Sequence, residues 1–283
     1  MKKLFLIFLF LFIQPACFAS GCEVTCPSGS LNIIEKESLL NKITGVSFAS
    51  KKIAEIAIQK ELKDELKSPF KANLEIYNVK RLKNGEFKAL TLQSEQINYR
   101  AASISDFYAQ TVCPYNKIIY QDGRVYYPHD LPFKFNAAIT NQDINNILNS
   151  YEFQRELEKV SLKINGFKGF AVKTPKVNIN NGKLNFSIPV ETFLSSNPFY
   201  INLNADIEVK NNKIVLKNII FSSNNNIINV DIFGVLVNKI NPVAFQMESI
   251  NSKYCRLYIT NSQISGNIIN TKGIFIINKN YGR

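Results

Sequence analysis

The strongest helical pattern in the chain covers residues 48–67, where apolar positions recur every three or four residues and charged positions fill the opposite face. The apolar positions are Ala49, Ile53, Ile56, Ala57, Leu62 and Leu66. Ser47 or Ser50 can cap the start of this helix. Ser68 should end it, because a residue that precedes proline disfavours the α conformation. The pattern predicts a long amphipathic helix near the N-terminus, about 30 Å in length.

Most of the chain beyond this helix alternates apolar and polar positions, which is typical of antiparallel sheet with one buried and one solvated face. Asn-Gly, Asp-Gly and Asn-Asn pairs at short intervals supply the turns. The predicted strands are residues 70–82 and 86–99, 117–121 and 124–127, a strand beginning at 133–135, 160–164, 177–179 and 184–190, 201–209 continuing to 221, 255–259 and 266–277. The fold class is therefore predicted as α+β. No linker rich in Pro, Gly or Ser divides the chain, so residues 22–283 are predicted to form a single domain.

Helical spacing interrupts the strands at several places. Thr140 and Asp143 resemble a capping box in which Asp replaces the usual Glu or Gln, and Ser150 can start the next helix. Asn241 and Pro242 would end the last helix, for which a β-branched strand is the alternative. The predicted shorter helices are residues 35–43, 144–148, 151–157 and 226–240.

The first 21 residues are predicted to be a secretory signal peptide. Lys2 and Lys3 precede an apolar run at residues 4–13, and small residues follow it. The run is about half as long as a membrane-spanning helix needs, although a short anchor is the alternative. Cleavage after Ala19 would release an exported protein into the periplasm or cell envelope. Cleavage after Gly21 would instead make the next residue, a cysteine, the site of a lipid anchor.

The cysteines fit an oxidising compartment. Cleavage after Ala19 leaves an even set that could form two disulfides in three pairings. Lipidation of Cys22 would leave an odd set among the other three, Cys26, Cys113 and Cys255. A zinc site at the first two cysteines is not expected, since only distant side chains could complete four ligands.

Composition favours an anionic partner and disfavours catalysis. The chain has 34 Lys+Arg against 22 Asp+Glu, a formal net charge of +12, and its apolar fraction of 46% excludes disorder. Export leaves phospholipid head groups or an anionic wall polymer as partners, and disfavours nucleic acid. His129 is the single histidine, and no nucleophile motif surrounds it or Asp130. Glu152 and Glu156 have the spacing of a solvated helix face. No enzymatic activity, cofactor or metal is therefore predicted.

Several segments, taken in order, resemble a known family. After the amphipathic helix come KNGEFKALTL at residues 83–92, PFKF at 132–135 and ITNQDINNIL at 139–148, then the pair Asn241-Pro242 and the final strands. This order resembles the LmeA-like phospholipid-binding domain family of bacterial cell-envelope proteins over residues 39–277. Gln142 replaces an acidic residue of the family pattern, which affects a helix cap rather than a ligand site.

The resemblance implies a tubular lipid-binding (BPI-like, TULIP-like) architecture, in which a strongly curved antiparallel β-sheet wraps around the long N-terminal amphipathic helix. It also implies that the protein binds anionic phospholipid in an apolar groove, as a lipid carrier or as an accessory to envelope lipid and glycan assembly. The alternative is a non-enzymatic structural or adaptor protein of the envelope that binds another protein or an anionic wall polymer.

An apolar groove would bind acyl chains, because each buried CH₂ contributes about 0.8 kcal/mol. Tyr126 and Tyr127 could instead touch a membrane interface, where amphipathic rings favour the head-group level. The candidate lining residues, each of which could equally be ordinary core, are Ile53, Ile56, Ala57, Phe133, Phe135, Phe186, Ile188, Leu203 and Ile207. The candidate head-group cations, each of which could equally be solvated surface, are Lys51, Lys52, Arg100 and Arg124.

Overall fold

The computed structural model describes residues 24, 26–27, 46–99, 102–121, 124–163, 170–192, 195–222, 237, 240–251 and 255–279. The predicted signal peptide, the helix predicted at residues 35–43 and most of the helix predicted at residues 226–240 lie outside this part of the chain.

The described residues form an α+β protein, as predicted, and its paired strands are antiparallel. The first sheet contains, in spatial order, β1 (Lys71–Glu75), β3 (Ala89–Tyr99), β4 (Ala102–Thr111), β8 (Leu131–Thr140), β15 (Ile268–Ile277) and β14 (Cys255–Ser265). The second sheet contains β10 (Lys176–Asn180), β11 (Lys183–Thr192), β12 (Ser195–Lys210) and β13 (Lys213–Ser222), with β9 (Phe170–Val172) paired to β11.

Two small strand pairs and five helices complete the described elements. The strand pairs are β2 (Glu86–Phe87) with β5 (Asn116–Lys117) and β6 (Ile119–Gln121) with β7 (Arg124–Tyr126). The helices are α2 (Val46–Leu66), α3 (Val79–Lys83), α4 (Asn141–Leu148), α5 (Tyr151–Lys163) and α7 (Pro242–Ile250).

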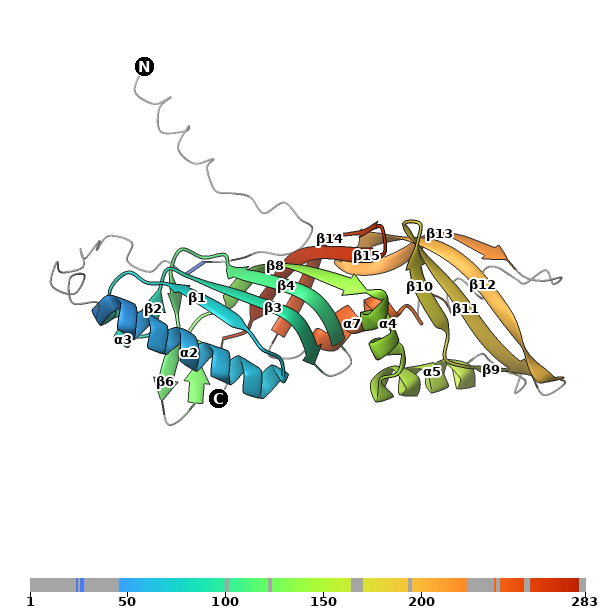
Figure 1. Cartoon of the computed structure of the whole chain (residues 1–283), viewed down its shortest axis with the longest axis horizontal. Coiled ribbons are helices and arrows are strands. Elements are labelled where there is room, and N and C mark those ends of the chain that lie inside the picture. The colour runs from blue at the N-terminus through green and yellow to red at the C-terminus, as the bar shows by residue number, and fades with distance from the viewer. Residues whose placement is uncertain are drawn as a thin grey trace, which may run out of the picture.

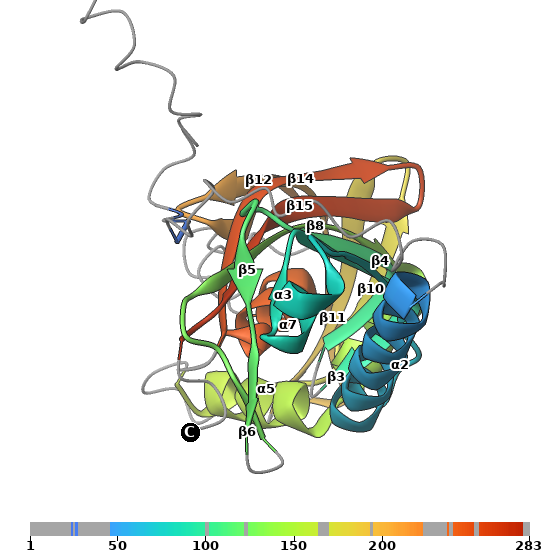
Figure 2. The ribbon, with the colours of Figure 1, turned by 90° about the vertical axis from the view of Figure 1, so that its left-hand side faces the viewer.

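The first sheet curls strongly into a half-barrel, and the second sheet extends the molecule at one end (Figure 1). Helix α7 contacts both β4 and β14, which β8 and β15 separate within the sheet. It must therefore lie across the concave face of the half-barrel, and Figure 2 shows it beneath the curl. The two sheets meet where β12 lies beside β14.

Each sheet has its own hydrophobic core. In the half-barrel, the rings of Phe133 and Phe275 stack with their centroids 4.7 Å apart. In the second core, α4 and α7 pack against the second sheet through residues such as Ile144 and Met247. The two cores adjoin, because Ile250 and Leu257 pack against both of them.

Helix α2 covers the predicted segment but begins at Val46, so neither serine proposed as its cap precedes it. The sheet does not wrap around this helix. Instead, α2 lies along the edge strand β1 (Figure 1), where the Leu74 amide donates to Glu55 Oε1 at 3.0 Å. The side chains that α2 packs against the half-barrel core are Ala54, Ile58, Leu62 and Leu66. The helix thus covers the free edge of the sheet. The sequence predicted a helix enclosed by the sheet, and the structure does not show that arrangement.

Two features of residues 76–111 differ from the prediction. The strand predicted over residues 70–82 stops early because the Asn78 side chain accepts from the Arg81 amide at 2.9 Å and starts α3. Strand β4 was not predicted. Its register shifts between Ser105 and Tyr108, and its inward positions are mostly small, so it lacks a clear apolar alternation.

One prediction in the second half of the chain is wrong, one is incomplete, and others are confirmed. The segment predicted as a strand at residues 160–164 is the last turn of α5 up to Lys163. Asn241-Pro242 begins α7, a helix that was not predicted, because the Asn241 side chain accepts from the first amides and proline suits the first turn. Of the helix predicted to end at this pair, the described residues show Val237 as helical and Ile240 in a turn. The hairpins at Asn181-Gly182 and Asn211-Asn212 are present, as is the capping box at the start of α4.

Candidate functional site

A pocket of about 410 Å³ lies where the second sheet, α7 and the edge strand β14 meet. Its volume is within the range of small-molecule sites, roughly 300–1,000 Å³. The lining residues come from the β12–β13 turn, from α7 and its C-terminal end, and from β14: Asn211, Asn212, Lys213, Ile214, Ala244, Met247, Glu248, Asn251, Leu257, Tyr258 and Ile259. A turn, a helix and an edge strand, all within residues 211–259, therefore build this site.

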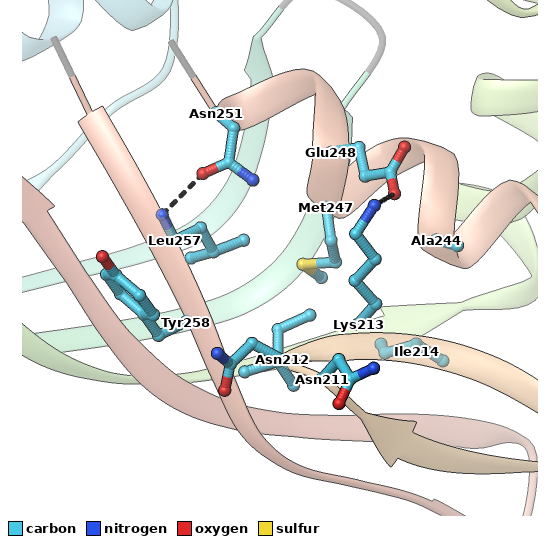
Figure 3. Close-up of a pocket in the computed structure, with 11 residues that line it drawn as sticks. Asn211, Asn212, Lys213, Ile214, Ala244, Met247, Glu248, Asn251, Leu257 and Tyr258 are labelled. Carbon is cyan, nitrogen blue, oxygen red and sulfur yellow. Dashed lines mark hydrogen bonds and ion pairs between the residues drawn. The ribbon is translucent and has the colours of Figure 1, made fainter. Parts of the chain in front are cut away.

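The pocket has an apolar floor. Ile214, Met247 and Ile259 are buried core residues that also line it. Met247 and Leu257 point into the space between α7 and β14 (Figure 3). Such a floor can bury a hydrocarbon segment, because apolar surface removed from water contributes about 25 cal/mol per Å².

The mouth of the pocket is polar. Lys213 Nζ lies 2.7 Å from Glu248 Oε1, and both side chains are exposed (Figure 3). The Leu257 amide donates to Asn251 Oδ1 at 2.7 Å, which fixes the end of α7 to β14. The turn residues Asn211 and Asn212 bring two further amide groups to the lining. A ligand with an apolar segment and an anionic end could thus meet hydrocarbon below and a lysine above, once Glu248 releases that lysine.

The three candidate lining residues on α2 do not face the half-barrel. Ile53, Ile56 and Ala57 are exposed on the side of the helix that points away from the sheet. The periodicity did not distinguish the faces, because α2 carries a second apolar stripe at Ala54 and Ile58, and that stripe packs inward.

The candidate lining residues on strands are buried, and they divide between the two cores. Phe133 and Phe135 belong to the half-barrel core. The other four, which belong to the second core, are Phe186, Ile188, Leu203 and Ile207. Phe186 and Leu203 are cross-strand partners. None of these residues lines the pocket described above, so their lipid contacts stay a prediction.

Two candidate head-group cations lie beside a buried carboxylate on α2. Lys51 Nζ is 3.6 Å from Glu55 Oε1, and Lys52 Nζ is 3.5 Å from Glu55 Oε2. Burial pushes the pKa of Glu55 up, but the Leu74 amide and the two lysines outweigh it and hold the pKa below its usual value. The third candidate, Arg124, starts β7, and the fourth, Arg100, lies outside the described residues.

Cys26 and Cys113 form a disulfide, which is consistent with an oxidising, extracytoplasmic location. Burial raises the pKa of the Cys255 thiol to about 11, so this thiol is protonated at neutral pH. Cys22 lies outside the described residues, so its lipidation stays a prediction. Asp130 accepts from Arg256 at 2.8 Å and ties the start of β8 to β14, which gives it a structural role.

Sequence reasoning missed the pocket residues, although two signals pointed towards them. The Asn211-Asn212 turn was recognised as a turn but not as part of a site. Asn241-Pro242 is typical of a helix start as well as of a helix end, and reading it as a start would have revealed α7. The meeting of these segments with β14 depends on tertiary structure, which no local pattern encodes.

Within the described residues, no helix combines the length and apolar character that a membrane-spanning helix needs. Across the same ranges, no group of three or more His, Cys, Asp or Glu side chains is placed to hold a metal ion. Comparisons with protein-family models, curated proteins and solved structures find no match to this chain.

Proposed function

We propose that this chain is an exported protein of the bacterial envelope that binds anionic phospholipid and acts as a carrier or accessory in envelope lipid assembly. The observation that carries the proposal is the pocket between α7 and β14, with its apolar floor and a lysine at its mouth. Without the predicted signal peptide, which holds Lys2 and Lys3 and no acidic residue, the formal net charge is 32 − 22 = +10. This charge and the Cys26–Cys113 disulfide support an anionic ligand in an oxidising compartment.

The proposal includes a relationship to the tubular lipid-binding architecture. The curled half-barrel and the second antiparallel sheet support it, whereas the position of α2 along the sheet edge departs from the expected arrangement. The pocket, rather than a groove under α2, is the proposed acyl site, since the inward side of α2 packs directly on the core. Its volume limits the occupant to one acyl segment with part of the head group.

Filling the pocket should remove the bound lipid. Ala244 lines the pocket and is half-buried, so Ala244→Phe places a ring in the ligand's space. Organic extraction of protein purified gently from its native envelope, followed by mass spectrometry, should show phospholipid with the unchanged chain. The variant should carry about tenfold less, equivalent to about 1.4 kcal/mol of binding free energy.

Ala171→Phe is the matched control, because Ala171 is a half-buried alanine on β9 that does not line the pocket. Its phospholipid content should equal that of the unchanged protein, while circular dichroism checks that both variants are folded. Absence of phospholipid from the unchanged protein, together with no uptake from anionic vesicles, would reject the proposal and favour the adaptor alternative.

The ion pair at the mouth predicts opposite effects for its two members. Lys213→Gln should weaken binding of an anionic lipid by about three- to tenfold, because a charge-assisted contact is lost at an exposed site. Glu248→Gln should strengthen it by up to about fivefold, because the lysine no longer has a competing carboxylate. Titration with short-chain phosphatidylglycerol measures both. Neither change should alter the affinity for short-chain phosphatidylcholine appreciably. If both changes shift the affinity for phosphatidylglycerol in the same direction, this prediction is wrong.

A further inference from the structure

The outward side of α2 carries a cluster of apolar side chains that the fold does not use. We name it the α2 outer patch, and its members are Phe48, Ala49, Ile53, Ile56 and Ala57. The three large members are 72%, 69% and 54% exposed in chain order. Residues three and four apart share one helix face, and contiguous exposed apolar residues rimmed by polar ones mark interaction surfaces.

Lysines are interleaved with this patch. Lys52 and Lys60 are exposed on the same side of the helix, and Lys52 must leave Glu55 Oε2, 3.5 Å from its Nζ, to reach a phosphate. The carboxylate of this half of the helix, Glu55, is buried and turned towards β1, where it accepts from Leu74. Exposed acidic side chains begin only at Glu61. The first four turns of α2 therefore present hydrocarbon and positive charge to solvent, without an exposed carboxylate among them.

We propose that the α2 outer patch docks the protein on the surface of an anionic phospholipid membrane. The apolar side chains would enter the boundary between head groups and acyl chains, and the two lysines would lie at the phosphates, which is how amphipathic interfacial helices bind. This inference extends the proposed function and rests on its premise that the ligand is an anionic phospholipid. A protein that exchanges such a lipid must reach the membrane that holds it.

The rest of the fold holds α2 in a fixed orientation, with the α2 outer patch facing solvent. Its inward residues Ala54, Ile58 and Leu62 pack on the half-barrel core, and the Glu55–Leu74 hydrogen bond fixes its rotation. The patch is thus presented without an ordering cost at the moment of binding. A second copy of the chain is the less suitable occupant, because two such patches face to face would bring four lysines together.

Vesicle cosedimentation tests the apolar part of the proposal. The unchanged protein should bind vesicles of phosphatidylglycerol and phosphatidylethanolamine, and bind phosphatidylcholine vesicles far less. The double variant Ile53→Asn/Ile56→Asn should bind the anionic vesicles at least about tenfold more weakly, since two anchors of apolar area are lost. Ile220→Asn is the matched control: Ile220 is 56% exposed on β13, against 54% for Ile56, and its replacement should leave binding unchanged.

A second pair of variants tests the charge. Lys52→Gln/Lys60→Gln should weaken anionic vesicle binding by about fivefold for each lysine removed and should flatten its dependence on salt. Lys176→Gln/Lys210→Gln changes the net charge equally, at exposed positions on the second sheet, and should have a much smaller effect. If both double variants lose the same vesicle affinity, the interaction depends only on net charge, and the assignment to α2 is wrong.

Two further results would overturn the proposal. One is unchanged vesicle binding by Ile53→Asn/Ile56→Asn. The other is that light scattering shows the unchanged protein as a dimer and the variant as a monomer, while neither binds vesicles. The patch would then be a self-association surface. The pocket proposal and the docking proposal can fail independently. Ala244→Phe should lose extractable phospholipid yet still cosediment with vesicles. Docking that persists while no extractable phospholipid is found would reject the pocket alone.

Discussion

Replacing Asp143 with alanine is expected to destabilise the protein by about 3 kcal/mol, because a fully buried carboxylate that accepts several hydrogen bonds is removed. Asp143 is 0% exposed at the start of α4. Its carboxylate accepts from Ser103 Oγ at 2.9 Å, from Ser105 Oγ at 2.8 Å, and from the Thr140 amide at 2.8 Å. The bond from the Thr140 amide is one half of the capping box, so the loss of that half is part of this cost. Urea unfolding followed by circular dichroism measures the change.

The position of Asp143 explains why this effect should spread beyond one helix. Ser103 and Ser105 belong to β4 of the half-barrel, whereas α4 packs into the second core. Gln246 of α7 also donates to the Ser103 carbonyl, so helices of the second core are tied to the half-barrel at one buried polar junction. Asp143→Ala should therefore loosen the arrangement of the two sheets and lower lipid binding at the pocket between them.

Asp64→Ala is the control, because Asp64 is exposed on α2. Its replacement should change the unfolding free energy by less than about 0.5 kcal/mol. Asp143→Asn should be nearly as damaging as Asp143→Ala, since the new amide brings donors to a site already crowded with donors. Equal midpoints for Asp143→Ala and Asp64→Ala would show that the junction does not stabilise the fold.

Local patterns predicted the elements whose causes are local. The Asn181-Gly182 hairpin and the Thr140–Asp143 capping box depend on residues within a few positions of each other, and both are present. Strand β4 escaped detection because its bulge at Asp106, with a φ of 51°, breaks the alternation that identifies a strand.

Features that depend on tertiary packing could not be predicted from local sequence patterns. Helix α2 has apolar residues on two sides, and only its packing against the half-barrel core decides that Ile58 faces inward and Ile56 outward. The pocket is assembled from a turn, a helix and a strand whose pairing depends on both sheets, so its residues carry no local signature. The candidate lipid residues were chosen for being apolar, a property that core residues such as Phe133 share.

Breaking the Cys26–Cys113 disulfide is expected to cost about 4–5 kcal/mol of stability, the largest single effect that we expect. The two cysteines are 87 residues apart in sequence, and the entropy that a cross-link removes from the unfolded chain grows with the length of the loop it closes. The bond joins the segment before α2 to the chain just after β4. The urea midpoint of the unchanged protein should fall sharply when a reductant is added.

Cys26→Ser separates loss of the cross-link from damage to the core, because Cys26 is exposed whereas Cys113 is 2% exposed. The change is best made with Cys22→Ser, so that the neighbouring cysteine cannot replace the lost partner. Cys255 should not do so at neutral pH, since burial raises the pKa of its thiol to about 11 and the thiolate is the reactive form. The double variant should unfold at the same urea concentration with and without reductant. If the urea midpoint of the double variant instead equals that of the oxidised unchanged protein, the cross-link does not stabilise the fold. The disulfide would then be weaker support for an oxidising compartment.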